Sequence, residues 1–231
     1  MPYLFYDIPS MIILLPALIL SFYAQYKVQN TFNKFIRVGN RGGYTGAEVA
    51  RKILDSQDLR DVPVDMVAGR LTDHYDPRKR VLRLSEEVYR GKSVASIGVA
   101  AHEAGHAMQH SNGYIPLSIR NAIVPIASFG SQASFLFIFL GLFIGSGTFL
   151  LDVGIYLFLG TVIFQLITLP VEFNASNRAV GLLVSQGFVM GDEEAKVKKV
   201  LNAAALTYVA AAASAVSQLL RLLMLRNRRR R

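Results

Sequence analysis

Three long stretches without charged side chains limit what this chain can fold into more than any other feature. Residues 8–26 and 200–220 contain no charged residue, and residues 121–171 contain only Asp152. A bilayer crossing needs about 20 consecutive, mostly apolar residues in an α-helix. Residues 8–26 suit one crossing, and residues 121–171 are long enough for two. We therefore expect a mainly α, membrane-embedded protein with three to four transmembrane helices.

Residues 8–26 predict a membrane anchor, and residues 121–171 predict a helical hairpin. The anchor lies within 1–26, and Pro16 is expected to kink it. A cleaved signal peptide is the alternative, but no Lys or Arg precedes the stretch and no clear cleavage site follows it. The hairpin is predicted at 122–144 and 149–170, with a Gly-Ser-Gly turn at 145–147. A buried hairpin of a soluble protein is the alternative for this second stretch.

Basic residues predict the side of the membrane on which each segment lies. Fifteen Lys and Arg lie in 27–120, and none precedes Lys27. Because cytoplasmic loops carry the excess of Lys and Arg, we expect the N-terminus outside and 27–120 in the cytoplasm. Six arginines lie in 221–231, and they would end outside if 200–220 also crossed. That Ala-rich stretch could cross, lie at the interface or pack against the other helices, so its placement stays open.

The segment between the anchor and the hairpin predicts a small α+β part with a short sheet. Thr45 and Glu48 have the spacing of a capping box, which predicts that a helix begins there. VPVDMV and RVLRLS alternate apolar and polar residues, with the turn signal YDPRK between them, so two or three short strands are expected. A further helix is predicted from Ser93 to Asn112. The chain then divides into an anchor, a cytoplasmic part, a hairpin and a C-terminal helical part with an arginine tail, at 1–26, 27–120, 121–171 and 172–231.

The last of these predicted helices carries His102, Glu103 and His106 in the pattern HEAGH. Residues four apart lie on one face of an α-helix, so both histidines can direct a ring nitrogen at one ion. The chain has no Cys, so any metal site must use His, Asp, Glu or water. Zinc accepts imidazole and carboxylate ligands, and the intervening glutamate can act as general base on a metal-bound water. The pattern predicts a zinc site, and a polar helix face with solvated histidines is the alternative.

A catalytic zinc site needs a third protein ligand. His110 lies two turns from His102, about 12 Å along a straight helix, which is too far for one ion. Asp152 lies at the distant turn of the predicted hairpin. Glu172 is the first charged residue after the hairpin and is predicted on the same side of the membrane as His106, so it is the favoured ligand. Its alternative role is a carboxylate that stabilises the start of a helix.

Several segments resemble the bacterial membrane zinc metallopeptidases of the YugP type. They cover most of the chain and read TGAEVARKIL, LTDHYDPR, VAAHEAGHAMQ, TLPVEFNASNRA and LNAAALTYVAAA. The resemblance implies a zinc-dependent, membrane-embedded peptidase with a small zincin-like (gluzincin) catalytic part. It implies that His102, His106 and Glu172 bind zinc and that Glu103 is the base.

The HtpX-type and CAAX-prenyl proteases are more distantly similar to this chain. They have Glu-x-x-Ala-Asp after the hairpin, whereas this chain has Ser176 in place of the Asp. A carboxylate at that position could orient a ligand histidine through a hydrogen bond. Ser176 is expected to orient a histidine only weakly.

Together these residues predict a membrane-embedded zinc metalloendopeptidase. Zinc and Glu103 would activate a water that attacks the peptide carbonyl, and Glu103 would pass the proton to the leaving amine. The predicted strand RVLRLS could pair with an extended substrate. A donor to the oxyanion is also expected, and the candidates are His74, Tyr75, His110 and Arg178.

The expected partners are the lipid bilayer and a peptide or membrane-protein substrate, since the third ligand directly follows a membrane helix. We expect a multi-pass protein of the bacterial plasma (inner) membrane whose catalytic part faces the cytoplasm. The formal net charge of +9 does not predict nucleic-acid binding, because six arginines lie in the tail and no nucleic-acid motif is present. Two alternatives remain: a non-catalytic membrane scaffold or adaptor with a structural zinc site, and a membrane-surface module bound through the arginine tail. The sequence makes no prediction of the oligomeric state.

Overall fold

The structure, a computed structural model, describes residues 8–144 and 148–229. The predicted turn at 145–147 lies outside the described residues. The chain forms two compact units. The division into four segments is not tested by these units and stays a prediction. The bundle unit contains Met1–Gln25, Ile119–Leu169 and Thr207–Arg231, and the sheet unit contains Tyr26–Ser118 and Pro170–Leu206.

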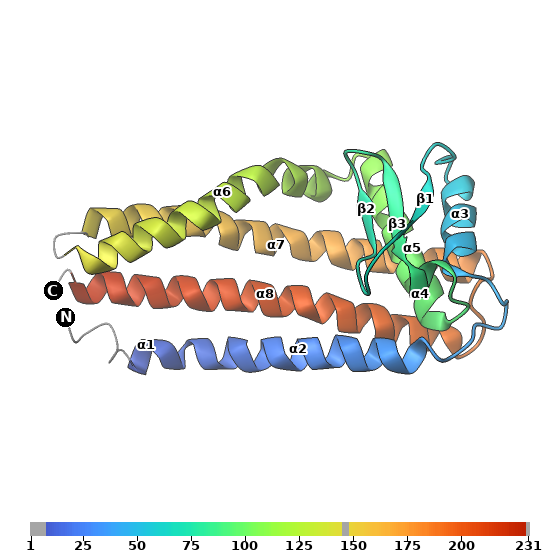
Figure 1. Cartoon of the computed structure of the whole chain (residues 1–231), viewed down its shortest axis with the longest axis horizontal. Helices are drawn as coiled ribbons and strands as arrows, with labels where there is room; N and C mark the ends of the chain where they lie inside the picture. Colours follow the sequence, from blue (N-terminus) through green and yellow to red (C-terminus); the bar gives the residue numbers. More distant parts are fainter. Residues whose placement is uncertain (1–7, 145–147, 230–231) are drawn as a thin grey trace. The chain divides into compact units, whose positions relative to one another are not determined.

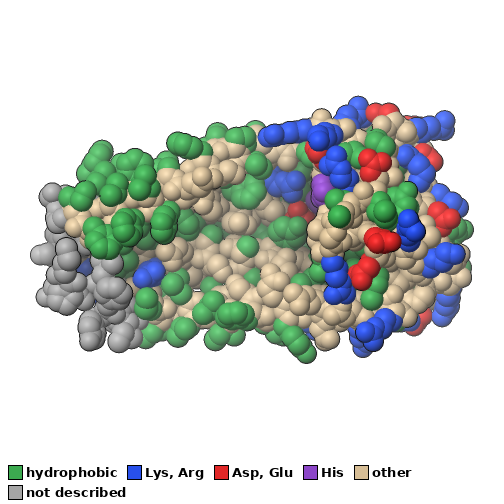
Figure 2. Space-filling model, in the orientation of Figure 1, with side chains coloured by type: hydrophobic (Ala, Val, Ile, Leu, Met, Phe, Trp, Pro, Cys, Tyr) green, Lys and Arg blue, Asp and Glu red, His purple; other side chains and the backbone are tan. Residues whose placement is uncertain are grey.

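The bundle unit consists mainly of portions of long helices, and these portions lie side by side in Figure 1. Within the described residues, four helices are long and apolar enough to cross a membrane. The prediction of a mainly α protein with three to four such helices is confirmed. On the face shown in Figure 2, hydrophobic side chains cover the helices of the bundle unit, whereas charged side chains gather over the sheet unit. The helices are α1 (Ile8–Ile12), α2 (Leu14–Phe35), α6 (Ile115–Phe143), α7 (Thr148–Ser185) and α8 (Glu193–Arg229).

The helix bounds differ from the predicted ones in two ways. The anchor is interrupted at Ile13, between α1 and α2, within one turn of Pro16, which has no N–H to continue the helical hydrogen bonds. Both hairpin helices are longer than predicted, because polar residues continue them beyond their apolar parts. Helix α6 begins at Ile115, and α7 continues through Pro170 to Ser185.

Close contacts join the helices of the bundle unit. The side-chain oxygens of Ser21 in α2 and Ser214 in α8 lie 3.1 Å apart. Asp152, near the start of α7, forms an ion pair with Arg226, near the end of α8, so these two helices run antiparallel. Charged groups inside a membrane protein are stabilised by such pairing. In the part of 200–220 that belongs to this unit, Leu219 packs against a core formed by Leu151 and Ile155 of α7 and Leu222 of α8. The same helix is also long and apolar enough to cross a membrane, so its placement stays a prediction.

The sheet unit is built around a three-stranded sheet in the order β1-β3-β2. Strand β1 (Val64–Val67) is parallel to β3 (Val81–Ser85), and β2 (His74–Asp76) is antiparallel to it. The predicted strands in VPVDMV and RVLRLS are confirmed. The proposal that RVLRLS pairs with a substrate is wrong, because β3 is the central strand and both of its edges are already paired.

Two helices of the sheet unit begin directly after residues whose side chains cap them. Thr45 and Glu48 form the predicted capping box at α3 (Gly46–Ser56). The Ser93 hydroxyl accepts the backbone N–H of Ser96 at 3.0 Å and so caps α5 (Val94–Ser111). Asn112 ends α5, and Gly113 follows with a φ of 61° that favours glycine. A short α4 (Glu86–Tyr89) connects β3 to this region.

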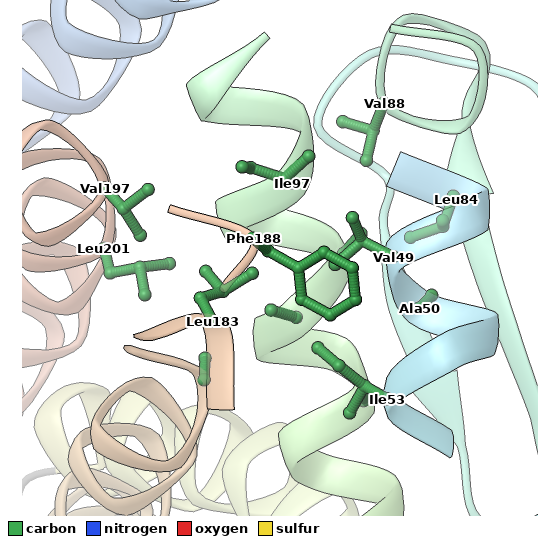
Figure 3. Packing of buried hydrophobic residues seen from close by; sticks show 14 of the residues in the cluster. Val49, Ala50, Ile53, Leu84, Val88, Ile97, Leu183, Phe188, Val197 and Leu201 are labelled. Carbon is green, nitrogen blue, oxygen red and sulfur yellow. The ribbon is translucent and has the colours of Figure 1, made fainter. Parts of the chain in front are cut away.

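Helix α5 is the centre of the hydrophobic core of the sheet unit. Figure 3 shows it between side chains of α3, such as Val49 and Ile53, and side chains of α8, such as Val197. Small residues allow this: a Cβ at Gly98 would lie 3.1 Å from the side chain of Val197. A helix packed on nearly all sides is a rigid support for the histidines it carries.

Candidate metal centre

Two helices of the sheet unit bring three candidate ligands together. Helix α5 presents His102 and His106, whose Nε2 atoms lie 3.2 Å apart. Helix α7 presents Glu172, whose Oε2 lies 3.3 Å from His102 Nε2 and 3.5 Å from His106 Nε2. Glu172 is only 3% exposed, although carboxylates are rarely so buried unless paired. Among the described residues, these three form a group that could hold a metal ion.

The spacing of the three donor atoms fits zinc. Zinc prefers tetrahedral coordination, with nitrogen and oxygen ligands about 2.0–2.2 Å away, so its ligand atoms lie about 3.4 Å apart. The three sides of the observed triangle are 3.2, 3.3 and 3.5 Å. Two imidazoles and one carboxylate also leave a fourth position for water or substrate, which is typical of catalytic zinc sites.

The triangle depends on a close approach of the two helices at Gly105. A Cβ at this position would lie 2.8 Å from the backbone oxygen of Ala175 in α7. Only glycine therefore permits this contact. Gly105 lies between His102 and His106 in α5, and Ala175 lies between Glu172 and Ser176 in α7.

Gly105→Ala is expected to weaken zinc binding about tenfold or more, a loss comparable with that of disturbed ligand support in other sites. The new methyl group meets backbone, which cannot move aside like a flexible side chain, so α7 and Glu172 must shift. Competition with a chromophoric chelator measures the affinity. Gly181→Ala is the matched control, since a Cβ at Gly181 meets no atom within 4 Å. Equal zinc affinity in the two variants would contradict the expectation.

Glu103 is held beside the group by β2. Its Oε2 accepts the backbone N–H of Tyr75 at 2.9 Å, and the residue is 8% exposed. Burial raises the pKa of Glu103 to about 7, although the neighbouring His102 and the Tyr75 N–H act in the opposite direction. A carboxylate in this position, next to the candidate ligands, can accept and release a proton near neutral pH.

Each candidate histidine has a hydrogen-bond partner at its other ring nitrogen. His102 Nδ1 lies 3.2 Å from the Ser176 hydroxyl, so the structure places Ser176 where an orienting residue was expected. His106 Nδ1 lies 3.0 Å from Gln109 Oε1. Gln109 was missed in the sequence. The available signal was its position three residues after His106, on the same side of the helix.

The remaining candidates have hydrogen-bond partners of their own. The Tyr75 hydroxyl lies 2.9 Å from His110 Nδ1, so His110 contacts β2. His74 is exposed, and its Nδ1 lies 2.7 Å from the backbone oxygen of Thr72, which fits a role in the turn. Arg178 Nε donates to the Asn174 side chain at 2.8 Å.

Comparison with known proteins gives two matches over most of the chain. A protein-family model described as "Putative neutral zinc metallopeptidase" matches residues 10–227. The chain is also 54% identical over 209 residues to "Putative membrane protease YugP" of Bacillus subtilis (strain 168), which covers 90% of this chain and 92% of that protein. No solved structure is significantly similar to it.

Proposed function

This chain belongs to the family of neutral zinc metallopeptidases, and we propose from its site that it is a membrane-embedded endopeptidase of the HExxH, gluzincin-like kind. In this proposal His102, His106 and Glu172 hold zinc, and Glu103 is the catalytic base. The observation that carries it is the triangle of three donor atoms with sides of 3.2 to 3.5 Å, formed by two helices.

The proposed reaction is the hydrolysis of a peptide bond by water. When bound, zinc would lower the pKa of a water molecule and polarise the scissile carbonyl. Glu103 accepts a proton from the attacking water and then gives it to the leaving amine, so the carboxylate is regenerated. The Tyr75 N–H holds the Glu103 side chain in place for both transfers.

A donor to the oxyanion is a second element of the proposal. Of the four candidates, Tyr75 and His110 are joined to each other, and Tyr75 is also joined to Glu103. We propose Tyr75 and His110 for the oxyanion role, because Tyr75 is the candidate whose backbone also binds the proposed base, Glu103.

Membrane proteins or membrane-associated peptides are the proposed substrates. Glu172 directly follows the apolar part of α7 in the same helix, which supports substrates whose cleaved segments lie close to the bilayer. The fifteen Lys and Arg of 27–120 support a cytoplasmic site in the bacterial plasma membrane. If α8 also crosses, antiparallel to α7, its last turns would lie on the opposite side, against the charge rule; there Arg226 is paired with Asp152.

Removal of the metal should abolish hydrolysis, and zinc should restore it. The test uses the full chain in detergent, with fluorescein-labelled casein and a single-span reporter protein as substrates. We expect activity to be lost on dialysis against a chelator and to return with one equivalent of zinc per chain. A chain that binds zinc without cleaving either substrate would support the alternative, a scaffold with a structural zinc site.

A further inference from the structure

We propose that Gln109 is a positioning residue that fixes the ring of His106 and holds the turn of α7 that carries Glu172; the inference rests on the proposed zinc site. Gln109 is fully buried, and a buried amide needs partners for its oxygen and its N–H groups. It has three: His106 Nδ1 at 3.0 Å, the Val171 backbone oxygen at 2.8 Å and Asn174 Oδ1 at 3.0 Å.

These partners determine which end of the Gln109 amide faces which neighbour. The Val171 carbonyl can only accept a hydrogen bond, so it must face the amide nitrogen. Asn174 presents its oxygen as well, because the same oxygen accepts from Arg178, whose guanidinium can only donate. The oxygen of Gln109 is thus left to face His106, and it can only accept.

The consequence is a fixed tautomer for His106. In its neutral form, His106 must carry the ring proton on Nδ1 to donate to Gln109, which leaves a lone pair on Nε2. That Nε2 is the atom that lies 3.5 Å from Glu172 Oε2. His102 is less constrained, because its partner is the Ser176 hydroxyl, which can donate or accept.

Gln109 also connects the two helices next to the third candidate ligand. Val171, whose carbonyl it binds, directly precedes Glu172 in α7. Arg178, which orients Asn174, lies over the ring of Tyr114, with its Cζ 5.9 Å from the ring centre. Any rotation of α7 that carried Glu172 away from His106 would have to break the two hydrogen bonds that Gln109 donates.

Two substitutions separate the chemistry of the amide from its volume. Gln109→Met keeps a side chain of similar length but removes every polar contact. Gln109→Glu keeps the shape and an acceptor for His106, but it places a carboxyl oxygen against two acceptors, the Val171 carbonyl and Asn174 Oδ1. Gln186→Met is the matched control, because Gln186 is in the same unit and its amide binds Ser56 of α3.

Zinc affinity of the detergent-solubilised full chain, measured by chelator competition, tests the proposal. We expect the dissociation constant to rise about 10- to 100-fold in both Gln109 variants, as for other residues that orient metal ligands, and to stay unchanged in Gln186→Met. A Gln109→Met protein that binds zinc as tightly as the wild type would overturn the inference while leaving the proposed function intact.

The Nδ1–H group of His106 gives a second readout, measured on the zinc-loaded protein. Nitrogen-15 NMR of the zinc-loaded wild type and of Gln109→Met, labelled at their four histidines, should show slow exchange of the His106 Nδ1 proton in the wild type and faster exchange in the variant. Equal exchange in the two proteins would overturn the role of Gln109. A wild type that binds no zinc would instead overturn the proposed site, so the two failures are distinguishable.

Discussion

Glu103→Gln should reduce peptide hydrolysis about 10²- to 10⁴-fold without loss of zinc, the range typical for removal of a general acid–base group. The amide cannot accept the proton of the attacking water. It does keep an oxygen for the Tyr75 N–H, so β2 and α5 should stay in place. The measurement is kcat/KM on the fluorescent substrate, with zinc content determined by elemental analysis of the same preparation.

Glu194→Gln is the control for this result. Glu194 lies on α8 and forms a partly exposed i,i+4 pair with Lys198, which contributes only a few tenths of a kcal/mol to stability. Both variants lose one carboxylate, yet only Glu103→Gln should lose activity. Hydrolysis at the wild-type rate by Glu103→Gln would rule out the proposed base.

Glu172→Gln should lose both zinc and activity. The neutral amide has the shape of the carboxylate but is a poor zinc ligand, and it brings N–H groups towards the two imidazoles. We expect zinc affinity to fall more than about 100-fold, since loss of a ligand should exceed the effect of losing an orienting residue. Chelator competition measures the affinity, and a thermal melt of the metal-free protein checks that the fold remains.

The same Glu194→Gln protein serves as control for Glu172→Gln. Together the variants make a pattern: Glu103→Gln keeps zinc but not hydrolysis, whereas Glu172→Gln keeps neither. Zinc bound by Glu172→Gln with wild-type affinity would mean that another group completes the site.

Local features of this fold were predictable because their causes lie within a few residues. The capping box of Thr45 and Glu48 and the cap at Ser93 depend on neighbours three residues away. The same holds for His102 and His106, which the helical repeat alone places on one face. The apolar stretches likewise predict membrane helices from length and composition.

Features that depend on contacts between distant segments were predictable only in part. Glu172 could be favoured because the hairpin returns the chain to the same side of the membrane. Gln109 was missed: its spacing from His106 is a local signal, but its contact with Val171, 62 residues away, is not visible in the sequence. The central place of β3 was missed for the same reason: the alternation of a strand indicates its faces but does not reveal which strands pair with its edges.

A crystal of the zinc-loaded chain, with anomalous diffraction recorded at the zinc absorption edge, tests the central claim most directly. The account predicts one zinc peak within about 2.2 Å of His102 Nε2, His106 Nε2 and a Glu172 carboxylate oxygen together. A peak bound to the histidines but out of reach of Glu172, or a peak at any other place in the chain, would contradict it.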